Sequence, residues 1–486
     1  MTPSASATRD TSAVKASAAA TLAEFCAGLC WDGLGEDVQA RTRELVLDLI
    51  GVGLAGSRQP SSAPAAEVAL KLGVGGPATI LGTPHRAEAA WAALANGTAA
   101  HAVELDDVTT ESSLHPGVAV IPAVLALAEA LNAPPKALLE AIVSGYEVTM
   151  RVGNALNPGS AYARGFHPTG VAGVFGATMA AGHLLRLPVD ALVSALGIAG
   201  TMASGSLEYL ADGAWTKRLN AGWAGHAGIT AAYLAQAGFS GPRTVFEGRL
   251  GVLHAYSDAP FPERLLADMS RPLQVMRVSI KPYACCRYNH GLIDCMLDLR
   301  RSPAFSLNAV ERIRLGVLSG GALLVADPIE RKRSPQGVVD AQFSAPYAAA
   351  TALLLGSGGM EAYTPSQLAD VRVRDLMART DCYSDASLDA EYPRRWPAAA
   401  EIHLRDGTVL QTRVEFATGE PENPVPLEGL HAKFMSLAAT SVADPEALAD
   451  AILTLDQAPN LSALTAALSA ECRVPSAECR VLSAEC

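Results

Sequence analysis

The sequence predicts a mainly α protein with a large all-helical domain and a smaller α+β domain. Hydrophobic residues make up 50% of the 486 residues and aromatic residues only 5%, so the core must be built from small aliphatic side chains. Such side chains favour closely packed helices over an aromatic-rich β-sandwich. Helical spacing of apolar residues continues from about residue 18 to residue 268, and strand-like patterns begin only after residue 271.

The N-terminal part of the chain predicts a series of helices. Residues 1–17 are rich in Ser, Ala and Thr without an apolar signal-peptide core, so we expect a disordered lead before a helical domain over 18–270. Val46, Leu49 and Ile50 form one stripe of a first long helix. Further helices are expected over residues 85–105 (on either side of Asn96-Gly97), 117–131, 134–156 and 188–207.

The stretch between Arg164 and Arg186 contains no charged residue and suggests a membrane span at first sight. However, His167, Pro168, His183 and repeated glycines make this span weak on a hydropathy scale. A helix buried on all sides of a large helical domain explains the composition better. We therefore expect no membrane partner.

The pattern changes after residue 270. Residues 273–286, 310–321 and 399–416 predict strands, and Asp406-Gly407 within the last of them is a strong hairpin signal. Helical segments lie between them, so residues 271–418 predict the α+β domain. Residues 419–468 begin with a Pro-rich linker and then return to helix, completing the helical domain. Residues 469–486 repeat a seven-residue unit with Cys and predict a low-complexity tail.

Charge and cysteine content exclude several classes of protein. The net charge of −12, from 37 basic and 49 acidic residues, disfavours nucleic acid as a partner. The nine cysteines, three of them in the repeated tail, form no secreted disulfide pattern, so we expect reduced thiols and a cytoplasmic location. An anionic small substrate fits the sequence, because cations can gather locally in a cleft between the two domains.

The densest cluster of chemically active side chains lies in residues 101–117. His101 and Glu104 are three residues apart and are expected to share a helix face, and Asp106, Asp107 and His115 follow at the helix end and in a loop. A His held by a carboxylate suits acid–base catalysis near neutral pH. The same residue types also suit a metal site, or a helix end with solvated acids. The spacing alone leaves these interpretations open.

Two further segments place polar side chains in apolar surroundings. His167 precedes Pro168 and a Gly-rich helix start, where backbone amides attract anions, but a buried structural His fits equally well. Lys217 and Arg218 stand in a Gly-rich stretch with little other charge. Buried cations need an anionic partner, which a substrate carboxylate or an internal acid could supply.

A fourth segment, residues 280–291, crowds Lys281, Cys286, Arg287 and His290 at the end of a predicted strand. The adjacent pair Cys285-Cys286 is a poor disulfide and a poor zinc site. The segment suits either a thiolate nucleophile activated by His290 or a cationic clamp for an anion. The sequence has no Walker A loop, no G-x-S-x-G elbow and no Rossmann fingerprint, so we expect no redox, nucleotide or pyridoxal phosphate cofactor.

Taken together in their order and spacing, these segments resemble the MmgE/PrpD family. The resemblance covers about residues 20–460 and rests on LVLDLIGVGLAG, ANGTAAHAVELDD, LHPG, GFHPTG, TKRLNAG and KPYACCRYNHG. Members of the family include 2-methylcitrate dehydratase, cis-aconitate decarboxylase and iminodisuccinate epimerase. The resemblance implies a large helical domain with a smaller α+β lid, a homodimer, and catalysis without a metal or organic cofactor.

The resemblance also implies site residues. Catalytic positions fall on Asp106, His115, His167, Lys217 and Lys281. Substrate-binding positions fall on Glu104, Asp107 and Cys286, and the cationic fourth segment adds Arg287 and His290 as expected substrate-binding residues. Two positions depart from relatives: Cys286 stands where some decarboxylases of the family have a catalytic His, and Thr110 where many bacterial members have a His. These departures put the transfer of a specific substrate in doubt.

We therefore expect a cofactor-independent lyase, a dehydratase or decarboxylase, that acts on a small di- or tricarboxylate such as 2-methylcitrate or cis-aconitate. Lysines would stabilise an enolate-like intermediate, and His115 and His167 would move a proton next to a carboxylate. Three alternatives stay open. They are an epimerase of an iminodisuccinate-like dicarboxylate, a non-catalytic dimeric binding protein, and a metal-dependent hydrolase built on His101, Glu104, Asp106 and His115.

Overall fold

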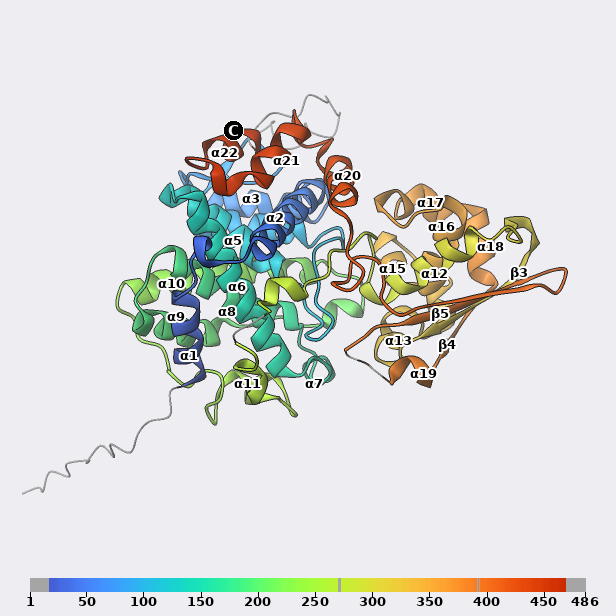
Figure 1. The fold of residues 1–486 in the computed structure, drawn as a ribbon, viewed down its shortest axis with the longest axis horizontal. Helices are drawn as coiled ribbons and strands as arrows, with labels where there is room; N and C mark the ends of the chain where they lie inside the picture. Colours follow the sequence, from blue (N-terminus) through green and yellow to red (C-terminus); the bar gives the residue numbers. More distant parts are fainter. Residues whose placement is uncertain (1–16, 270–271, 391, 393, 469–486) are drawn as a thin grey trace, which may run out of the picture.

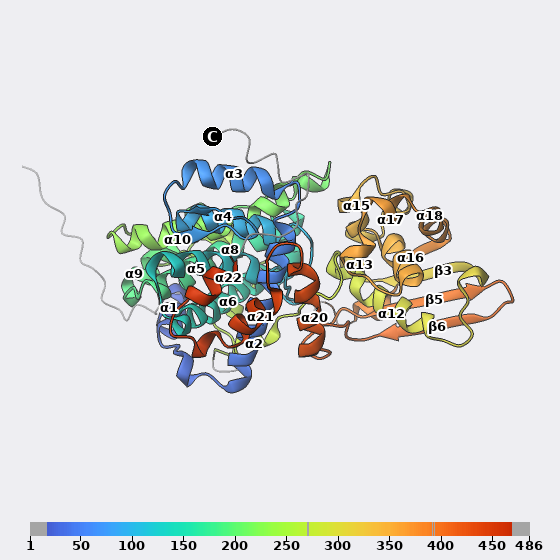
Figure 2. The same ribbon diagram turned by 90° about the horizontal axis from the view of Figure 1, so that it is seen from above.

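The computed structural model describes residues 17–269, 272–390, 392 and 394–468. The predicted repeat tail and, apart from Ser17, the predicted lead lie outside these ranges. Figure 1 and Figure 2 show a large helical part beside a smaller part that contains a four-stranded sheet. The prediction of a mainly α fold is therefore confirmed.

The helical part is formed by about the first three-fifths of the chain and by the last three helices of the described residues. Its first helices are α1 (Ala18–Ala27), α2 (Glu36–Gly56), α3 (Ser62–Leu72), α4 (Ala89–Ala100), α5 (Gly117–Leu131) and α6 (Pro135–Leu156). They are followed by α7 (Pro158–Ala163), α8 (Pro168–Leu184), α9 (Val189–Met202), α10 (Thr216–Gln236) and α11 (Val252–Tyr256). A short hairpin of β1 (Ala78–Thr79) and β2 (Arg86–Ala87) lies between α3 and α4.

Helix α8 lies at the centre of this part, in contact with α5, α6, α9 and α10. Every residue of α8 except His183 is buried, as expected for a helix surrounded by other helices. None of the helices in the described ranges is long and apolar enough to cross a membrane. Small residues let the helices approach closely: a Cβ on Gly97 of α4 would lie 2.9 Å from the Cα of Gly222 of α10. Helix α4 runs unbroken through Asn96-Gly97.

The smaller part, called the lid, comprises residues 290–414. Its helices are α12 (His290–Arg300), α13 (Ser319–Val325), α14 (Ile329–Lys332), α15 (Val338–Gln342), α16 (Ala345–Leu355), α17 (Pro365–Ala369), α18 (Val371–Ala378) and α19 (Ala386–Asp389). Its strands are β3 (Val310–Val317), β4 (Thr380–Ser384), β5 (Ala398–Leu404) and β6 (Val409–Val414). They are ordered β4-β3-β5-β6, with β4 parallel to β3 and the other neighbours antiparallel.

The predicted strands in the lid are confirmed, including the hairpin. Residues of β5 alternate between buried and half-buried, and Ile402 pairs with Ile313 of β3 and Leu410 of β6. Asp406-Gly407 joins β5 to β6, with Gly407 at a φ of 88°, a conformation that favours glycine. Helix α12 packs on β5 and β6.

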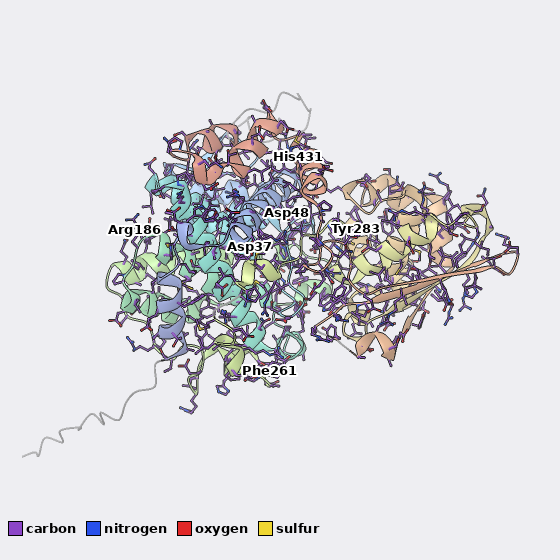
Figure 3. The ribbon with its side chains drawn as sticks, in the orientation of Figure 1. Asp37, Asp48, Arg186, Phe261, Tyr283 and His431 are labelled. Carbon is purple, nitrogen blue, oxygen red and sulfur yellow. The ribbon has the colours of Figure 1, made fainter. Side chains whose placement is uncertain are left out.

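The predicted strand over residues 273–286 is wrong. A short 3₁₀ helix covers Gln274–Arg277, and after it only Ser279 forms a β-bridge, to Val108. Val275, Val278 and Ile280 are buried against the helical core, so their β-branched character reflects burial rather than strand pairing. This segment connects the helical part to the lid, and Figure 3 shows Tyr283 where the two parts meet.

The chain then returns to the helical part with α20 (Leu427–Ala438), α21 (Pro445–Leu453) and α22 (Ser462–Leu468). Helices α20 and α21 pack against α2. The Lys433 ammonium of α20 donates to the buried Asp48 carboxylate of α2 at 2.6 Å and to the Leu105 carbonyl oxygen at 3.0 Å. The last helices therefore help to hold the loop that follows α4.

Candidate active site

A cavity of about 510 Å³ lies between the helical part and the lid. The predicted site residues that line it are Glu104, His115, His167, Lys217, Lys281, Cys286 and Arg287. They come from the loop after α4, the starts of α8 and α10, and the segment between the 3₁₀ helix and α12. Segments that are far apart in the sequence therefore supply one site.

The loop of residues 101–116 forms the floor of the site. Helix α4 ends at Ala100, so the expectation that His101 and Glu104 share a helix face is wrong. Glu104 instead has a φ of 57°, a strained left-handed conformation for a non-glycine residue. The bridge between Val108 and Ser279 fixes the loop against the connecting segment.

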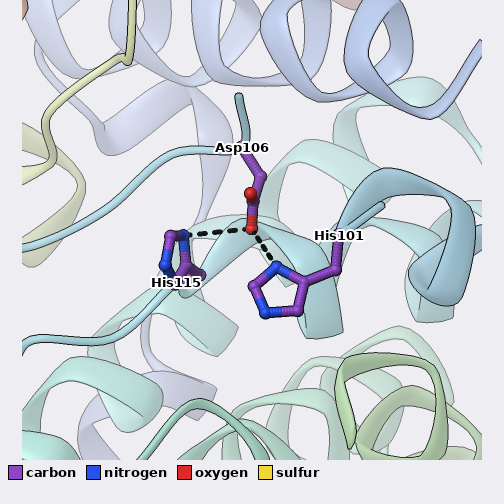
Figure 4. Close-up of side chains that lie close together, drawn as sticks. All are labelled: His101, Asp106 and His115. Carbon is purple, nitrogen blue, oxygen red and sulfur yellow. Dashed lines mark hydrogen bonds and ion pairs between the residues drawn. The ribbon is translucent and has the colours of Figure 1, made fainter. Parts of the chain in front are cut away.

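Asp106 is fully buried and holds two imidazoles (Figure 4). Its Oδ2 lies 2.7 Å from Nδ1 of His101 and 3.0 Å from Nδ1 of His115. Burial alone would raise the pKa of Asp106, but His101 and His115 together hold it well below its ordinary value. The carboxylate is therefore ionised, and it can stabilise a neighbouring imidazolium.

The hydrogen bonds of His115 define which ring nitrogen faces the cavity. Its Nδ1 lies 2.7 Å from the Asp107 carbonyl oxygen as well as 3.0 Å from Asp106, and both oxygens accept only. The Nδ1 proton is therefore fixed, and Nε2 is the atom left to take up or release a proton. His115 lines the cavity, so this proton exchange can reach a ligand.

His167 is the N-cap residue of α8, as the His-Pro pattern predicts. The Asn220 side-chain nitrogen lies 3.3 Å from its Nδ1 and 3.5 Å from the Ser206 carbonyl oxygen. An amide that donates to both leaves the ring proton of His167 on Nε2. Burial, with help from His101 and Lys217, lowers the pKa of His167 well below its ordinary value. The ring is thus a neutral hydrogen-bond donor.

Two lysines converge on Glu104. The Lys217 ammonium donates to the Glu104 carboxylate, and the Lys281 ammonium donates to the Glu104 carbonyl oxygen at 2.5 Å. Burial opposes ionisation of Glu104, yet the two lysines keep its pKa below its ordinary value. Lys217 also lies 5.0 Å from the ring centroid of Phe343 in the lid. A ligand carboxylate could replace Glu104 as the partner of either lysine.

The far wall of the cavity is aromatic. Tyr288 stacks on Trp396 with ring centroids 4.1 Å apart, and the Tyr288 and Tyr392 hydroxyls lie 2.9 Å apart. Arg287 is paired with Glu420 and lies 5.7 Å from the Trp396 ring, so its charge already has a partner. Burial raises the pKa of the Cys286 thiol, which does not favour the thiolate nucleophile considered above.

The structure places Asp107 and His290 behind the cavity wall. Asp107 accepts from the Tyr146 hydroxyl at 2.6 Å and from the Gly117 amide at 3.0 Å, so it fixes the start of α5. His290 is fully buried as the first residue of α12, with its ring against Tyr283. Both are therefore suited to position the site rather than to touch a ligand.

Sequence reasoning missed several residues of the site. His101 was considered for acid–base or metal chemistry but was not chosen as a site residue, and Tyr162, Tyr209, Tyr392 and Trp396 of the cavity wall were not considered at all. These aromatic residues are scattered along the chain and carry no local motif. A helix through Lys217 would have been the signal for Asn220, which follows Lys217 by three residues in α10 and so shares its face.

A metal ion is the other ligand that this loop could hold. His101, Asp106 and His115 each offer one ligand atom, and these atoms lie within 4.8 Å of one another. The Nε2 of His101 and the Oδ1 of Asp106 are buried without a hydrogen-bond partner within the described ranges. His and carboxylate ligands suit several divalent metals.

These features define a two-part helical protein whose cavity brings two imidazoles together with two lysines that contact Glu104. The chain belongs to the MmgE/PrpD family. The MmgE/PrpD N-terminal domain matches residues 20–264, and the MmgE/PrpD C-terminal domain matches residues 283–457. The predicted resemblance is thereby confirmed.

Several curated relatives of the chain are cis-aconitate decarboxylases or a protein named after them. The cis-aconitate decarboxylase-like protein oryM of Aspergillus oryzae is 28% identical over 90% of this chain and 94% of its own length. The cis-aconitate decarboxylase of Aspergillus terreus is 26% identical over 95% and 98% of the two chains. The human cis-aconitate decarboxylase is 27% identical over 91% and 92%.

Proposed function

We propose that the protein is a lyase that acts on a small polycarboxylate through an enolate-like intermediate, with decarboxylation as the leading reaction. The observation that carries this proposal is the convergence of His115, His167, Lys217 and Lys281 on one cavity. The curated relatives favour loss of CO₂ over loss of water.

The lysines would bind and stabilise the anion. Both lysines lie beside the Glu104 carboxylate, so a bound carboxylate could take over one of them while Glu104 keeps the other. When the carbon–carbon bond to the departing carboxyl group breaks, CO₂ leaves and its electron pair stays on the substrate. That charge moves into an adjoining carboxylate next to Lys217 or Lys281, where an ammonium group in a water-poor site stabilises it strongly.

The imidazoles would move the proton. His115 in its imidazolium form, stabilised by Asp106, delivers a proton from Nε2 to the carbon that lost CO₂, and it recovers a proton from water. The neutral His167 donates a hydrogen bond through Nε2 to a substrate oxygen. In a dehydration the same His115 would instead remove the proton next to a carboxylate, and a second acid would protonate the leaving hydroxyl.

The test is to incubate the protein with cis-aconitate, 2-methylcitrate and related acids, and to measure CO₂ release and product mass. We expect release of CO₂ that disappears in the Lys217→Ala variant. A product lighter by one water would assign a dehydratase, and inverted stereochemistry without a mass change would assign an epimerase. Failure to convert any polycarboxylate would contradict the proposal.

A metal-dependent hydrolase is the second candidate, because His101, Asp106 and His115 are placed to bind an ion. Metal analysis of the purified protein separates the two. Stoichiometric metal, with activity lost to a chelator and restored by that metal, would replace the cofactor-free proposal. Activity that survives exhaustive chelation would exclude the hydrolase.

A further inference from the structure

The cavity is larger and more apolar than a small polycarboxylate requires. Its volume is about 510 Å³. A six-carbon tricarboxylate has roughly a dozen non-hydrogen atoms and would fill at most ~360 Å³, even if each atom took the ~30 Å³ of a liquid water molecule. Space for several further carbon atoms remains beside the lysines and imidazoles.

The remaining space is lined by apolar side chains from both parts of the molecule. Tyr209 and Leu210 come from the helical part, Leu323 and Leu324 from α13 of the lid, and Trp396 from the segment before β5. Apolar side chains offer water no hydrogen bonds, whereas an alkyl group that leaves solvent to contact them binds with favourable free energy. The wall therefore favours a ligand that is apolar at the end remote from Lys281.

The apolar wall continues to the surface. Tyr209, Leu210, Leu323 and Leu324 line both the main cavity and an adjoining hollow of about 260 Å³. Trp215 also lines this hollow, whose other walls carry charged side chains, among them Arg218, Asp327, Arg331, Lys332 and Asp340. The Leu323 side chain is 82% exposed and that of Leu210 is 42% exposed. Large apolar side chains exposed together at the mouth of a site are typical of a surface that a ligand covers.

We infer that the natural substrate is a polycarboxylate that carries an alkyl chain. Its carboxylates lie at Lys217, Lys281 and the imidazoles, and its chain runs along Tyr209 and the leucines of α13 toward the mouth. This inference rests on the proposed function, because it assumes that the lysines bind substrate carboxylates. The proposed function concerns the carboxylates of the substrate, and this inference adds that the rest of the substrate is an alkyl chain.

The test uses unreactive ligands, so that binding is separated from turnover. Isothermal titration calorimetry would compare methylsuccinate, butylsuccinate and hexylsuccinate. We expect the affinity to rise about fourfold for each added methylene that is buried, equivalent to ~0.8 kcal/mol, with an increasingly negative heat-capacity change.

A matched pair of variants tests where the alkyl chain of the ligand binds. In the natural protein, affinity is expected to rise from methylsuccinate to hexylsuccinate. Leu323→Asp is expected to make this rise in affinity at least tenfold smaller. Leu250→Asp is the control, because Leu250 is 83% exposed, almost as much as Leu323, and lies away from both cavities. An equal effect of both variants, or no effect of Leu323→Asp, would overturn the assignment of this passage.

The outcomes distinguish this inference from the proposed function. If methylsuccinate binds and longer chains bind no better, the alkyl inference is wrong and the carboxylate site stands. If affinity grows with chain length but no alkylated or short polycarboxylate is converted, the proposed reaction is wrong and the ligand class stands. If none of the three acids binds, both are overturned.

Discussion

Asp106 is the residue on which the proton chemistry of the site depends. Its single Oδ2 atom contacts the Nδ1 atoms of His101 and His115, and it lies behind them rather than in the cavity wall. It is therefore a positioning residue that acts through the imidazoles, whereas the sequence placed it among the catalytic residues. A buried carboxylate in this place fixes the ring tautomer and stabilises the protonated ring.

The first prediction concerns His167. Replacing it by alanine should lower kcat by about 10²–10³-fold, because a hydrogen-bond donor aimed at the charge that develops on a substrate oxygen contributes on that order. Thermal stability should change little, since the ring lines an existing cavity and its partner in the described ranges is the Asn220 amide. Steady-state kinetics and thermal melting measure both effects.

His183→Ala is the control, because His183 lies on the same helix and faces Glu140 away from the cavity. We expect this variant to keep full kcat. A His167→Ala protein that retains kcat, or that loses activity only in proportion to lost folded protein, would show that His167 has a structural role.

The second prediction concerns Asp107. Burial raises the pKa of this carboxyl to about 7, although the hydrogen bonds from Tyr146 and Gly117 act to lower it. The folded protein therefore keeps a proton between about pH 4 and pH 7 that the unfolded chain has released. Its contribution to the free energy of unfolding is fully present below about pH 4 and is lost as the pH rises to about 7.

Asp107→Asn removes this titration, so the variant should gain stability relative to the natural protein as the pH rises, by at most ~1.4 kcal/mol per unit. Urea unfolding at pH 5 and pH 7.5 measures the difference. The exposed Asp37, labelled in Figure 3, provides the control variant Asp37→Asn. The free energy of unfolding of this variant should differ from that of the natural protein by the same amount at both pH values. Parallel pH curves for Asp107→Asn and the natural protein would refute the assignment.

At the scale of elements, α10 connects packing to the site. Its first turn carries Lys217, and its Gly222 lies against α4. A Cβ on Gly222 would overlap the Leu94 carbonyl and the Thr98 side chain. Gly222→Ala should therefore destabilise the protein by about 1–3 kcal/mol and lower kcat/KM, because α10 and Lys217 must shift together.

Gly337→Ala is the matched control, since a Cβ there has no neighbour within 4 Å and its backbone is extended. Denaturant unfolding and kinetics of both variants measure the two effects. If Gly222→Ala matched Gly337→Ala in both assays, the close contact between α4 and α10 would not position Lys217.

The elements show where sequence patterns suffice and where they fail. Starts of helices at Pro135 and His167-Pro168 and the Asp406-Gly407 hairpin were predicted, because local backbone chemistry determines them. Residues 273–286 were mistaken for a strand, because burial between two parts selects the same β-branched side chains as a sheet does. The left-handed Glu104 could not be foreseen, since tertiary contacts with Lys281 hold it there.

At the scale of the whole molecule, the charged floor of the site was predictable and its apolar wall was not. Motifs of the family mark the loop 101–116, His167, Lys217 and Lys281, and their convergence is visible in the structure. The wall depends on how the lid sits against the helical part. Single aromatic residues such as Tyr209 and Trp396 meet there without any sequence pattern. The predicted domain boundaries stay a prediction.

The last prediction concerns the expected homodimer. One face of α10 and of the residue before it exposes Trp215, Leu219, Trp223 and Tyr233, all within one stripe at helical spacing. His226 lies in the same stripe, stacked on Trp223 at 5.2 Å. Beside the stripe is a hollow lined by Leu72, Trp91, His226 and Tyr233.

Projecting aromatic side chains beside an apolar hollow make this surface able to pair with a second copy of itself about a two-fold axis. We expect light scattering coupled to size-exclusion chromatography to give the mass of a dimer, and Trp223→Asp to give that of a monomer. Leu250→Asp, on an exposed leucine outside the stripe, should remain dimeric. A monomeric natural protein, or a Trp223→Asp variant that stays dimeric, would refute this surface. Since Lys217 follows Trp215 by two residues, the dimeric and monomeric forms should also differ in kcat/KM if the partner orders the start of α10.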